Sequence, residues 1–251
     1  MLGSVPVVLL HGVPETPAVW EPLRAALGRS DVETPRLPGF GAPRPAGFGA
    51  TKEEYVTWLE GELTRIGAAG PVDLLGHDWG GGFVVRLVST RPDLVRSWVT
   101  DAAAIGGPGF EWHDFAKIWQ TPGAGEDFFA EQLAAPLDDR AAVFEAFGIP
   151  TERARALAGW VDAEMAATIL VLYRSAVDVG SEWGPDFVDI TVPGLTLLPS
   201  DDPFLSADGA RAAARRAGAP VAELPGRGHW WMLQDPEGTA AVLQEFWASV
   251  N

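Results

Sequence analysis

The chain has 251 residues, 47% of them hydrophobic, which is enough to bury one sizeable core or a core with an inserted subdomain. It contains no cysteine, which excludes disulfides and thiolate chemistry and fits a reducing cytoplasm. The formal net charge of −16 argues against nucleic acid and anionic membranes as partners. The opening stretch, MLGSVPVVLLHG, has no basic segment and a short apolar run, so we expect neither a signal peptide nor a membrane span.

Short apolar runs alternate with helical patterns along most of the chain. Strands are predicted at 6–10, 31–34, 72–75, 97–100, 194–198 and 220–224, and helices at 19–27, 52–66, 81–90, 207–217 and 238–250. The second strand, DVET, is the weakest because it is charged. This alternation predicts an α/β fold with a mainly parallel, doubly wound sheet. In such sheets functional residues gather at the carboxyl ends of the strands.

The alternation stops between about Ala104 and Asp189, where only helical pieces are predicted, at 114–119, 126–134, 140–147 and 152–173. We therefore expect a helical lid (cap) at 104–189, inserted into a core formed by 1–103 and 190–251. The lid is rich in tryptophan and phenylalanine. These aromatic side chains either pack the lid onto the core or together line an apolar pocket.

The segment GHDWGG, residues 76–81, places Asp78 among glycines directly after the apolar run PVDLL. Asp78 could cap the helix that follows. It could also sit in a nucleophile elbow, a sharp turn between strand and helix that presents one side chain above the sheet. Three other segments follow predicted strands: HGVPET, PSDDPF and GRGHWW. The order Asp, acid, histidine matches the chain order of an α/β-hydrolase triad.

On these motifs the chain resembles the α/β-hydrolase superfamily over nearly its whole length. An Asp in the elbow is similar to epoxide hydrolases and haloalkane dehalogenases, which share GHDWGG. HGVPE is similar to the HG-x-P-E pattern of epoxide hydrolases, and WQTPGAGE and LYR look like segments of their lids. The resemblance implies a hydrolase that needs no cofactor or metal and converts an epoxide and water into a vicinal diol.

Two features depart from the epoxide hydrolase pattern. The family normally uses two lid tyrosines, and this chain has only Tyr55 and Tyr173. The second position is occupied by Phe115, so either Tyr173 acts alone or His113 or Trp119 replaces the missing donor. The family also has two antiparallel strands before HG, and we expect them to be missing because few residues precede PVVLLHG. The charged strand DVET would then lie at a sheet edge.

The resemblance and the chemistry of epoxides together give the expected roles. The Asp78 carboxylate would displace the ring oxygen and form an alkyl ester, while Tyr173 would donate a hydrogen bond to the departing oxygen. Trp119, Phe115 and His113 are the candidate substrate-binding residues. The expected partners are a small apolar organic substrate and water.

The ester would then be hydrolysed by water that His229 activates. The backbone N–H groups of Val13 and Trp79 would stabilise the oxyanion, and Asp202 would orient the imidazole of His229. The resemblance favours Asp202 as the triad acid. The neighbouring Asp201 and the strand-end Asp101, the position used by some dehalogenase-type relatives, are either alternative acids or ordinary turn residues.

The remaining histidines show no spacing typical of metal ligands. His11 is expected to shape the oxyanion loop, and His77 to point away from the nucleophile. Two other functions stay open: a haloalkane dehalogenase with the same nucleophile, in which Trp79 and a lid tryptophan bind halide, and a non-catalytic protein that binds a small molecule. The sequence leaves the oligomeric state open, a homodimer included.

Overall fold

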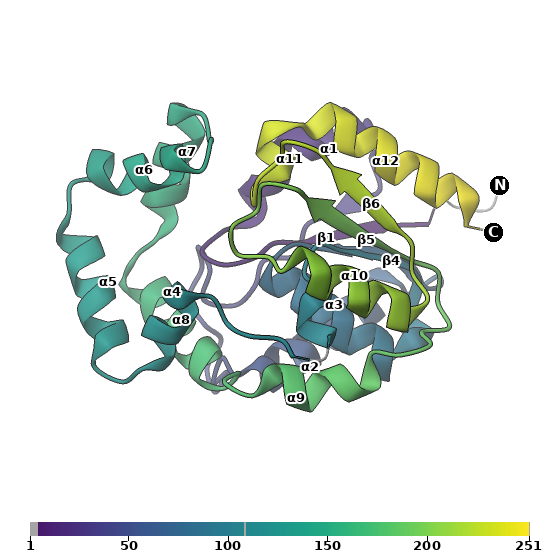
Figure 1. The fold of residues 1–251 in the computed structure, drawn as a ribbon, viewed down its shortest axis with the longest axis horizontal. Helices are drawn as coiled ribbons and strands as arrows, with labels where there is room; N and C mark the ends of the chain where they lie inside the picture. The colour runs from purple at the N-terminus through teal and green to yellow at the C-terminus, as the bar shows by residue number, and fades with distance from the viewer. Residues whose placement is uncertain (1–4, 108, 251) are drawn as a thin grey trace.

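The computed structural model describes residues 5–107 and 109–250, and its centre is a parallel sheet of six strands (Figure 1). The strands are β1 (Val7–Leu10), β2 (Val32–Glu33), β3 (Val72–Gly76), β4 (Val95–Thr100), β5 (Gly194–Pro199) and β6 (Val221–Leu224). Their spatial order is β2-β1-β3-β4-β5-β6, and all neighbours are parallel. The predicted α/β fold with a mainly parallel sheet is confirmed, and Val32–Glu33 of the charged DVET segment form the edge strand β2.

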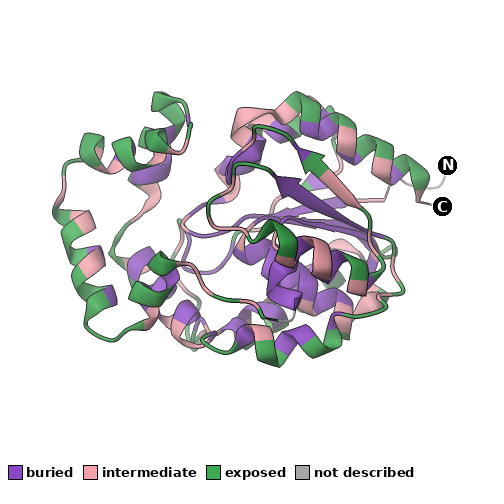
Figure 2. Ribbon diagram, in the orientation of Figure 1, coloured by how far each residue is buried: buried purple, intermediate pink, exposed green. Residues whose placement is uncertain are grey.

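Helices cover both faces of the sheet because successive strand residues point to opposite sides. Val7 and Leu9 belong to one buried cluster, whereas Val8 and Leu10 belong to another. The first cluster includes α1 and α12, and the second includes α2, α3 and α10. In Figure 2 the strands β1, β3 and β5, which are buried throughout, form the layer between these helices. The five helices are α1 (Glu21–Leu27), α2 (Lys52–Ile66), α3 (Trp79–Thr90), α10 (Ala207–Ala217) and α12 (Pro236–Ser249).

Two of the predicted helices, α2 and α10, begin and end at the predicted residues. In α2 this follows from a capping box, in which the side chains of Thr51 and Glu54 each accept a hydrogen bond from the other residue's backbone N–H. The helix predicted at 19–27 instead divides into a 3₁₀ turn at Pro17–Trp20 and the helix α1. A short helix, α11 (Trp231–Gln234), was not predicted.

Between β4 and β5 the described residues form helices and no strand. The larger helices α4 to α8 lie beyond the carboxyl ends of the strands, on the left in Figure 1. Their outward faces are mostly exposed (Figure 2). The helices of this segment are α4 (Asp114–Gln120), α5 (Ala124–Ala134), α6 (Leu137–Ala146), α7 (Thr151–Trp160), α8 (Ala163–Arg174) and α9 (Val179–Trp183).

The single helix predicted at 152–173 is wrong, because the chain turns by 78° between α7 and α8. Asp162 starts the new helix: its Oδ1 accepts a hydrogen bond from the backbone N–H of Met165 at 2.8 Å. In the described part of the chain, no single helix has the length and apolar composition to cross a membrane. The bent pair α7 and α8 meets that criterion only when the two helices are taken together.

Candidate active site

Asp78 lies in a strained turn between β3 and α3. Its backbone φ is 51° and its ψ is −121°, a conformation that residues other than glycine rarely adopt. Glycine permits the tight packing around it, since a Cβ at Gly80 would lie 2.3 Å from the carbonyl oxygen of Leu10. Asp78 precedes the first residue of α3 but makes no side-chain capping hydrogen bond. The helix-cap interpretation is therefore wrong.

The loop after β1 passes directly over the Asp78 carboxylate. The backbone N–H of Val13 donates to Oδ1 of Asp78 at 2.8 Å. A Cβ at Gly12 would lie 2.5 Å from the Cβ of Asp78, so only glycine lets the loop approach this closely. The N–H of Trp79, at the start of α3, is a second backbone donor that favours the ionised carboxylate. Both N–H groups can stabilise negative charge on the oxygen of an Asp78 ester.

Burial raises the pKa of Asp78 to about 6, while His229, His77 and the Trp79 N–H oppose the rise. At neutral pH the carboxylate is therefore mostly ionised, although burial keeps it poorly solvated. The side chain retains 18% exposure and lines a cavity. A poorly solvated carboxylate that faces a cavity is suited to act as a nucleophile.

His229 pairs with Asp202, the favoured acid candidate. Nδ1 of His229 lies 2.8 Å from Oδ2 of Asp202. Burial by itself would lower the pKa of His229 and raise that of Asp202. The attraction between the two groups outweighs burial, so the pKa of His229 is raised and that of Asp202 is lowered. Nε2 of His229 is 3.9 Å from Oδ2 of Asp78, too far for a hydrogen bond. The imidazole thus faces the nucleophile without binding it.

The two alternative acids bind other partners. Asp101 accepts a hydrogen bond from the backbone N–H of Asp78 at 2.9 Å and also contacts His77. Asp201 is exposed and accepts a hydrogen bond from the hydroxyl of Ser200 at 2.7 Å. Neither carboxylate is paired with His229 in the described residues.

Asp78 and His229 line an aromatic cavity of about 120 Å³ beneath the helices of the 104–189 segment. The expected substrate-binding residues His113, Phe115 and Trp119 also line this cavity, which we call the aromatic cavity, and so does Tyr173. A second cavity of about 310 Å³ extends toward the β4–α4 connection and shares Asp78, His113 and His229 with the first. The structure thus brings the predicted reactive and substrate-binding side chains together.

Hydrogen-bond donors surround the aromatic cavity near Asp78. Burial and the Asp78 charge raise the pKa of Tyr173 well above its usual range, so its phenol stays protonated. Burial lowers the pKa of His113 to about 4. Nδ1 of His113 accepts a hydrogen bond from the Ala116 N–H at 3.2 Å, which places the ring hydrogen on Nε2. The indole N–H of Trp119 is buried and has no partner in the described part of the chain.

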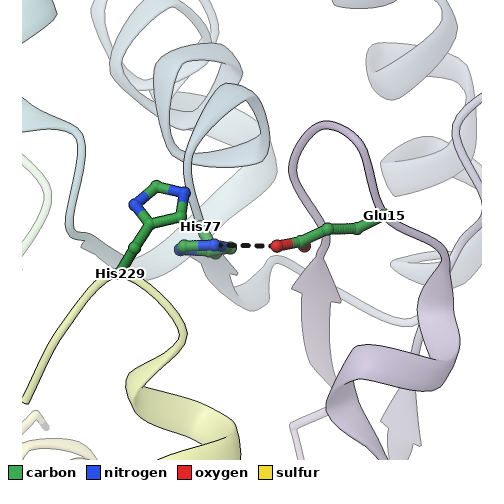
Figure 3. Close-up of side chains that lie close together, drawn as sticks. All are labelled: Glu15, His77 and His229. Atoms are coloured by element: carbon green, nitrogen blue, oxygen red, sulfur yellow. Dashed lines mark hydrogen bonds and ion pairs between the residues drawn. The ribbon is translucent and has the colours of Figure 1, made fainter. Parts of the chain in front are cut away.

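A buried ionic network that was not predicted from the sequence lies next to His229, with His77 between His229 and Glu15 (Figure 3). His77 contacts Asp101 through Nδ1 at 2.5 Å and Glu15 through Nε2 at 3.1 Å. Burial disfavours a charged His77, but the two carboxylates outweigh it and raise its pKa well above the usual range. Burial by itself would raise the pKa of Glu15, but the charge of His77 and its hydrogen bond lower this pKa to about 2. The rings of His77 and His229 lie 4.6 Å apart between centroids.

This network includes the one group of side chains in the described residues that is spaced for a metal ion. Ligand atoms of Glu15, His77 and His229 lie within 4.8 Å of one another (Figure 3). However, both ring nitrogens of His77 already contact carboxylates, and the raised pKa keeps the ring protonated. A protonated imidazole offers no lone pair to a metal. The donor set therefore fits an ionic network better than a metal centre.

Other residues of the aromatic cavity were also missed. Arg140, Val143, Phe144 and Phe147 line it from α6 and the residue that follows α6. They recur at positions i, i+3, i+4 and i+7, the spacing of one helix face. That spacing was the available signal in the sequence, but it could not show whether the face meets a cavity or the core.

Comparison with known proteins agrees with this fold. The model of the alpha/beta hydrolase family matches residues 7–242. The 2-(acetamidomethylene)succinate hydrolase of Mesorhizobium japonicum is 28% identical, over 97% of this chain and 88% of its own length. An epoxide hydrolase structure from Vigna radiata gives a TM-score of 0.77 at 18% identity, covering 98% of this chain and 92% of that one. A haloalkane dehalogenase structure from Bradyrhizobium elkani gives 0.72 at 20% identity, covering 99% and 93%.

Proposed function

The chain belongs to the alpha/beta hydrolase family, and we propose that it is a hydrolase that opens epoxides to vicinal diols through an ester on Asp78. One observation carries the proposal: a mostly ionised Asp78 and a protonated Tyr173 line the same aromatic cavity. Opening an epoxide needs a nucleophile at carbon and an acid at oxygen, and these two side chains supply them.

In the first half-reaction, Oδ2 of Asp78 attacks an epoxide carbon, and the bond from that carbon to the ring oxygen breaks. The departing oxygen takes a proton from the phenol of Tyr173, which later recovers a proton from solvent. Oδ1 remains hydrogen-bonded to the N–H of Val13. The product of this step is a hydroxyalkyl ester of Asp78.

In the second half-reaction, His229 removes a proton from water, and the water oxygen attacks the carboxyl carbon of Asp78. The N–H groups of Val13 and Trp79 stabilise the tetrahedral oxyanion. Asp202 stabilises the imidazolium that forms on His229, which then protonates the leaving diol oxygen. Asp78 leaves this step as a carboxylic acid and releases its proton to solvent, which balances the proton that Tyr173 recovers. One epoxide and one water are consumed, and Asp78 now carries an oxygen from water.

A second candidate is haloalkane dehalogenation, favoured by two indole N–H groups. Nε1 of Trp119 is buried and has no partner in the described residues, whereas the buried indole N–H of Trp79 interacts with the phenol of Tyr173 and works to lower its pKa. Their rings pack against Tyr173, with centroids 5.5 Å and 4.8 Å from its ring. These two indole N–H groups, from residues that each line a cavity with Asp78, could bind a departing halide, although Val13 adds no side-chain donor to that site.

A substrate panel tests these candidates. It contains aryl epoxides, 1-haloalkanes and 2-(acetamidomethylene)succinate, for whose hydrolysis the Mesorhizobium japonicum relative is named. We expect diol from the epoxides with the wild-type protein and none with Asp78→Ala. Halide release without diol formation would transfer the assignment to dehalogenation. Equal turnover by Asp78→Ala would contradict both, and binding without turnover would favour a non-catalytic binding protein.

A further inference from the structure

The aromatic cavity contains one arginine, Arg140, which has no acidic partner among the residues that the structure describes. Its Nη1 donates to the carbonyl oxygen of Val161, at the end of α7, at 3.2 Å. Its Nε is buried and has no hydrogen-bond partner, and the residue forms no ion pair within the described ranges. Among the residues that line this cavity, Arg140 is the only lysine or arginine. One arginine is thus placed in a wall that is otherwise mostly apolar and aromatic.

Neighbouring arginines in the same segment do have acidic partners. Arg153 pairs with Glu21, and Arg174 pairs with Glu126. The chain has 34 acidic residues against 18 basic ones, so potential partners are abundant. A partly buried cation is costly unless an opposite charge compensates it. Binding Val161 uses one of the five N–H donors of Arg140, and the edge formed by Nε and Nη2 makes no hydrogen bond in the described part of the chain.

Aromatic rings connect the Arg140 side of the cavity to the catalytic side. Phe147 follows α6, the helix that carries Arg140, and its ring lies 5.3 Å from that of Phe204. The ring of Phe204 lies 5.1 Å from that of His229. A ligand along this wall would meet apolar surface between a positive charge and the reactive groups.

We propose that Arg140 binds a carboxylate at the end of the substrate remote from the reacting bond. Apart from the Nη1 hydrogen bond to Val161, the guanidinium N–H groups can serve a carboxylate in the cavity that Arg140 lines, and partial burial strengthens that interaction. The substrate would then be an epoxide with an aryl or alkyl segment and a terminal carboxylate. Only the epoxide group in this description rests on the proposed function. A local cation is needed because the strongly acidic protein otherwise repels such an anion.

Binding of two matched probes tests this proposal without any turnover. The probes are 4-phenylbutyrate and its neutral amide, titrated calorimetrically into the wild-type protein. We expect the carboxylate to bind about 10-fold or more tightly than the amide. In Arg140→Gln this preference should fall to about 1, while Arg153→Gln, which removes an exposed arginine from α7, should retain it.

Equal binding of the two probes to the wild-type protein, or no binding of the carboxylate, would overturn the proposal. So would a preference that survives in a folded Arg140→Gln. Because the wild-type comparison needs no variant, misfolding of Arg140→Gln cannot obscure the result. Failure of the epoxide mechanism leaves this test unaffected, since neither probe reacts with Asp78.

Discussion

Asp78 owes its chemistry to two opposing influences on one carboxyl group. Burial raises its pKa, while the nearby histidines and a backbone N–H keep most of it ionised at neutral pH. The triad candidates could be predicted from the sequence because each stands in a short motif directly after a strand. The network of Glu15 and His77 could not, because its partners are 62 residues apart and meet only in the folded chain. For the same reason, the sequence could not show that Arg140 has no acidic partner in the described residues.

The phenol of Tyr173 gives the first prediction. Tyr173→Phe should lower the rate of ester formation about 10²-fold, because the departing oxygen loses its acid. Stopped-flow tryptophan fluorescence in a single turnover measures that rate. Tyr55→Phe is the matched control, since Tyr55 is the only other tyrosine and its hydroxyl binds the carbonyl oxygen of Pro38. A near wild-type rate in Tyr173→Phe would move the donor role to His113 or Trp119.

The pKa of Asp78 gives a prediction for pH dependence. Because this pKa is raised to about 6, acidification below that value protonates the nucleophile. The rate of ester formation should therefore fall roughly 10-fold per pH unit well below the pKa. Tyr173, whose pKa is raised well above its usual range, should cause no loss at mildly alkaline pH. A rate of ester formation that stays constant down to about pH 4.5 would contradict a nucleophile with this pKa.

At the scale of elements, the elbow depends on how closely α3 approaches β1. Strong periodicity and local caps made α2 and α10 predictable to the residue, because those signals lie within each helix. The break between α7 and α8 was missed, since an apolar pattern runs through both helices and only the Asp162 cap marks the turn. The contact between α3 and β1 could not be predicted either, because it depends on two elements that are far apart in the sequence.

Alanine substitutions at Gly80 and Gly82 distinguish the close contact of α3 with β1 from the general effect of replacing a helical glycine. Both residues lie in α3, but only Gly80 packs against the backbone of β1. Gly80→Ala should cost about 1–3 kcal/mol of unfolding free energy, because its Cβ would collide with rigid backbone. It should also reduce activity by displacing Asp78. In Gly82→Ala the nearest atom is the tip of Ile105 at 3.3 Å, so the variant should be as stable as wild type or more so. Urea unfolding measures the unfolding free energy of both variants. An equal change in Gly80→Ala and Gly82→Ala would contradict the close packing of the elbow.

At the scale of the molecule, the buried network joins the ends of four strands. Glu15 follows β1, His77 follows β3, Asp101 follows β4, and Trp230 follows β6. Nε1 of Trp230 donates to Oε1 of Glu15 at 2.6 Å. The network therefore holds in register the loops that carry the oxyanion donors, the nucleophile and the base.

Glu15→Gln should destabilise the protein by about 3–5 kcal/mol at neutral pH, because it leaves His77 with one carboxylate fewer in a buried site. Glu15 has its pKa lowered from 4.5 to about 2, so its contribution is present above pH 4.5 and is lost as the pH falls toward 2. The difference in unfolding free energy from wild type should shrink over that range. Glu223→Gln, which removes an exposed partner of Arg211, should change stability little. If Glu15→Gln lowered the unfolding free energy as little as Glu223→Gln does, the result would argue against a stabilising role for the network.

Isotope labelling tests the ester on Asp78 most directly. Enzyme in excess over an epoxide substrate is allowed one turnover in ¹⁸O-water, and the diol and the peptide containing Asp78 are analysed by mass spectrometry. Because water attacks the carboxyl carbon of Asp78, the first diol should be mostly unlabelled and the peptide should gain ¹⁸O. Under multiple turnovers the diol should become labelled as well. Label in the first-turnover diol, with none in the Asp78 peptide, would mean that water attacks the epoxide directly and would contradict the covalent mechanism.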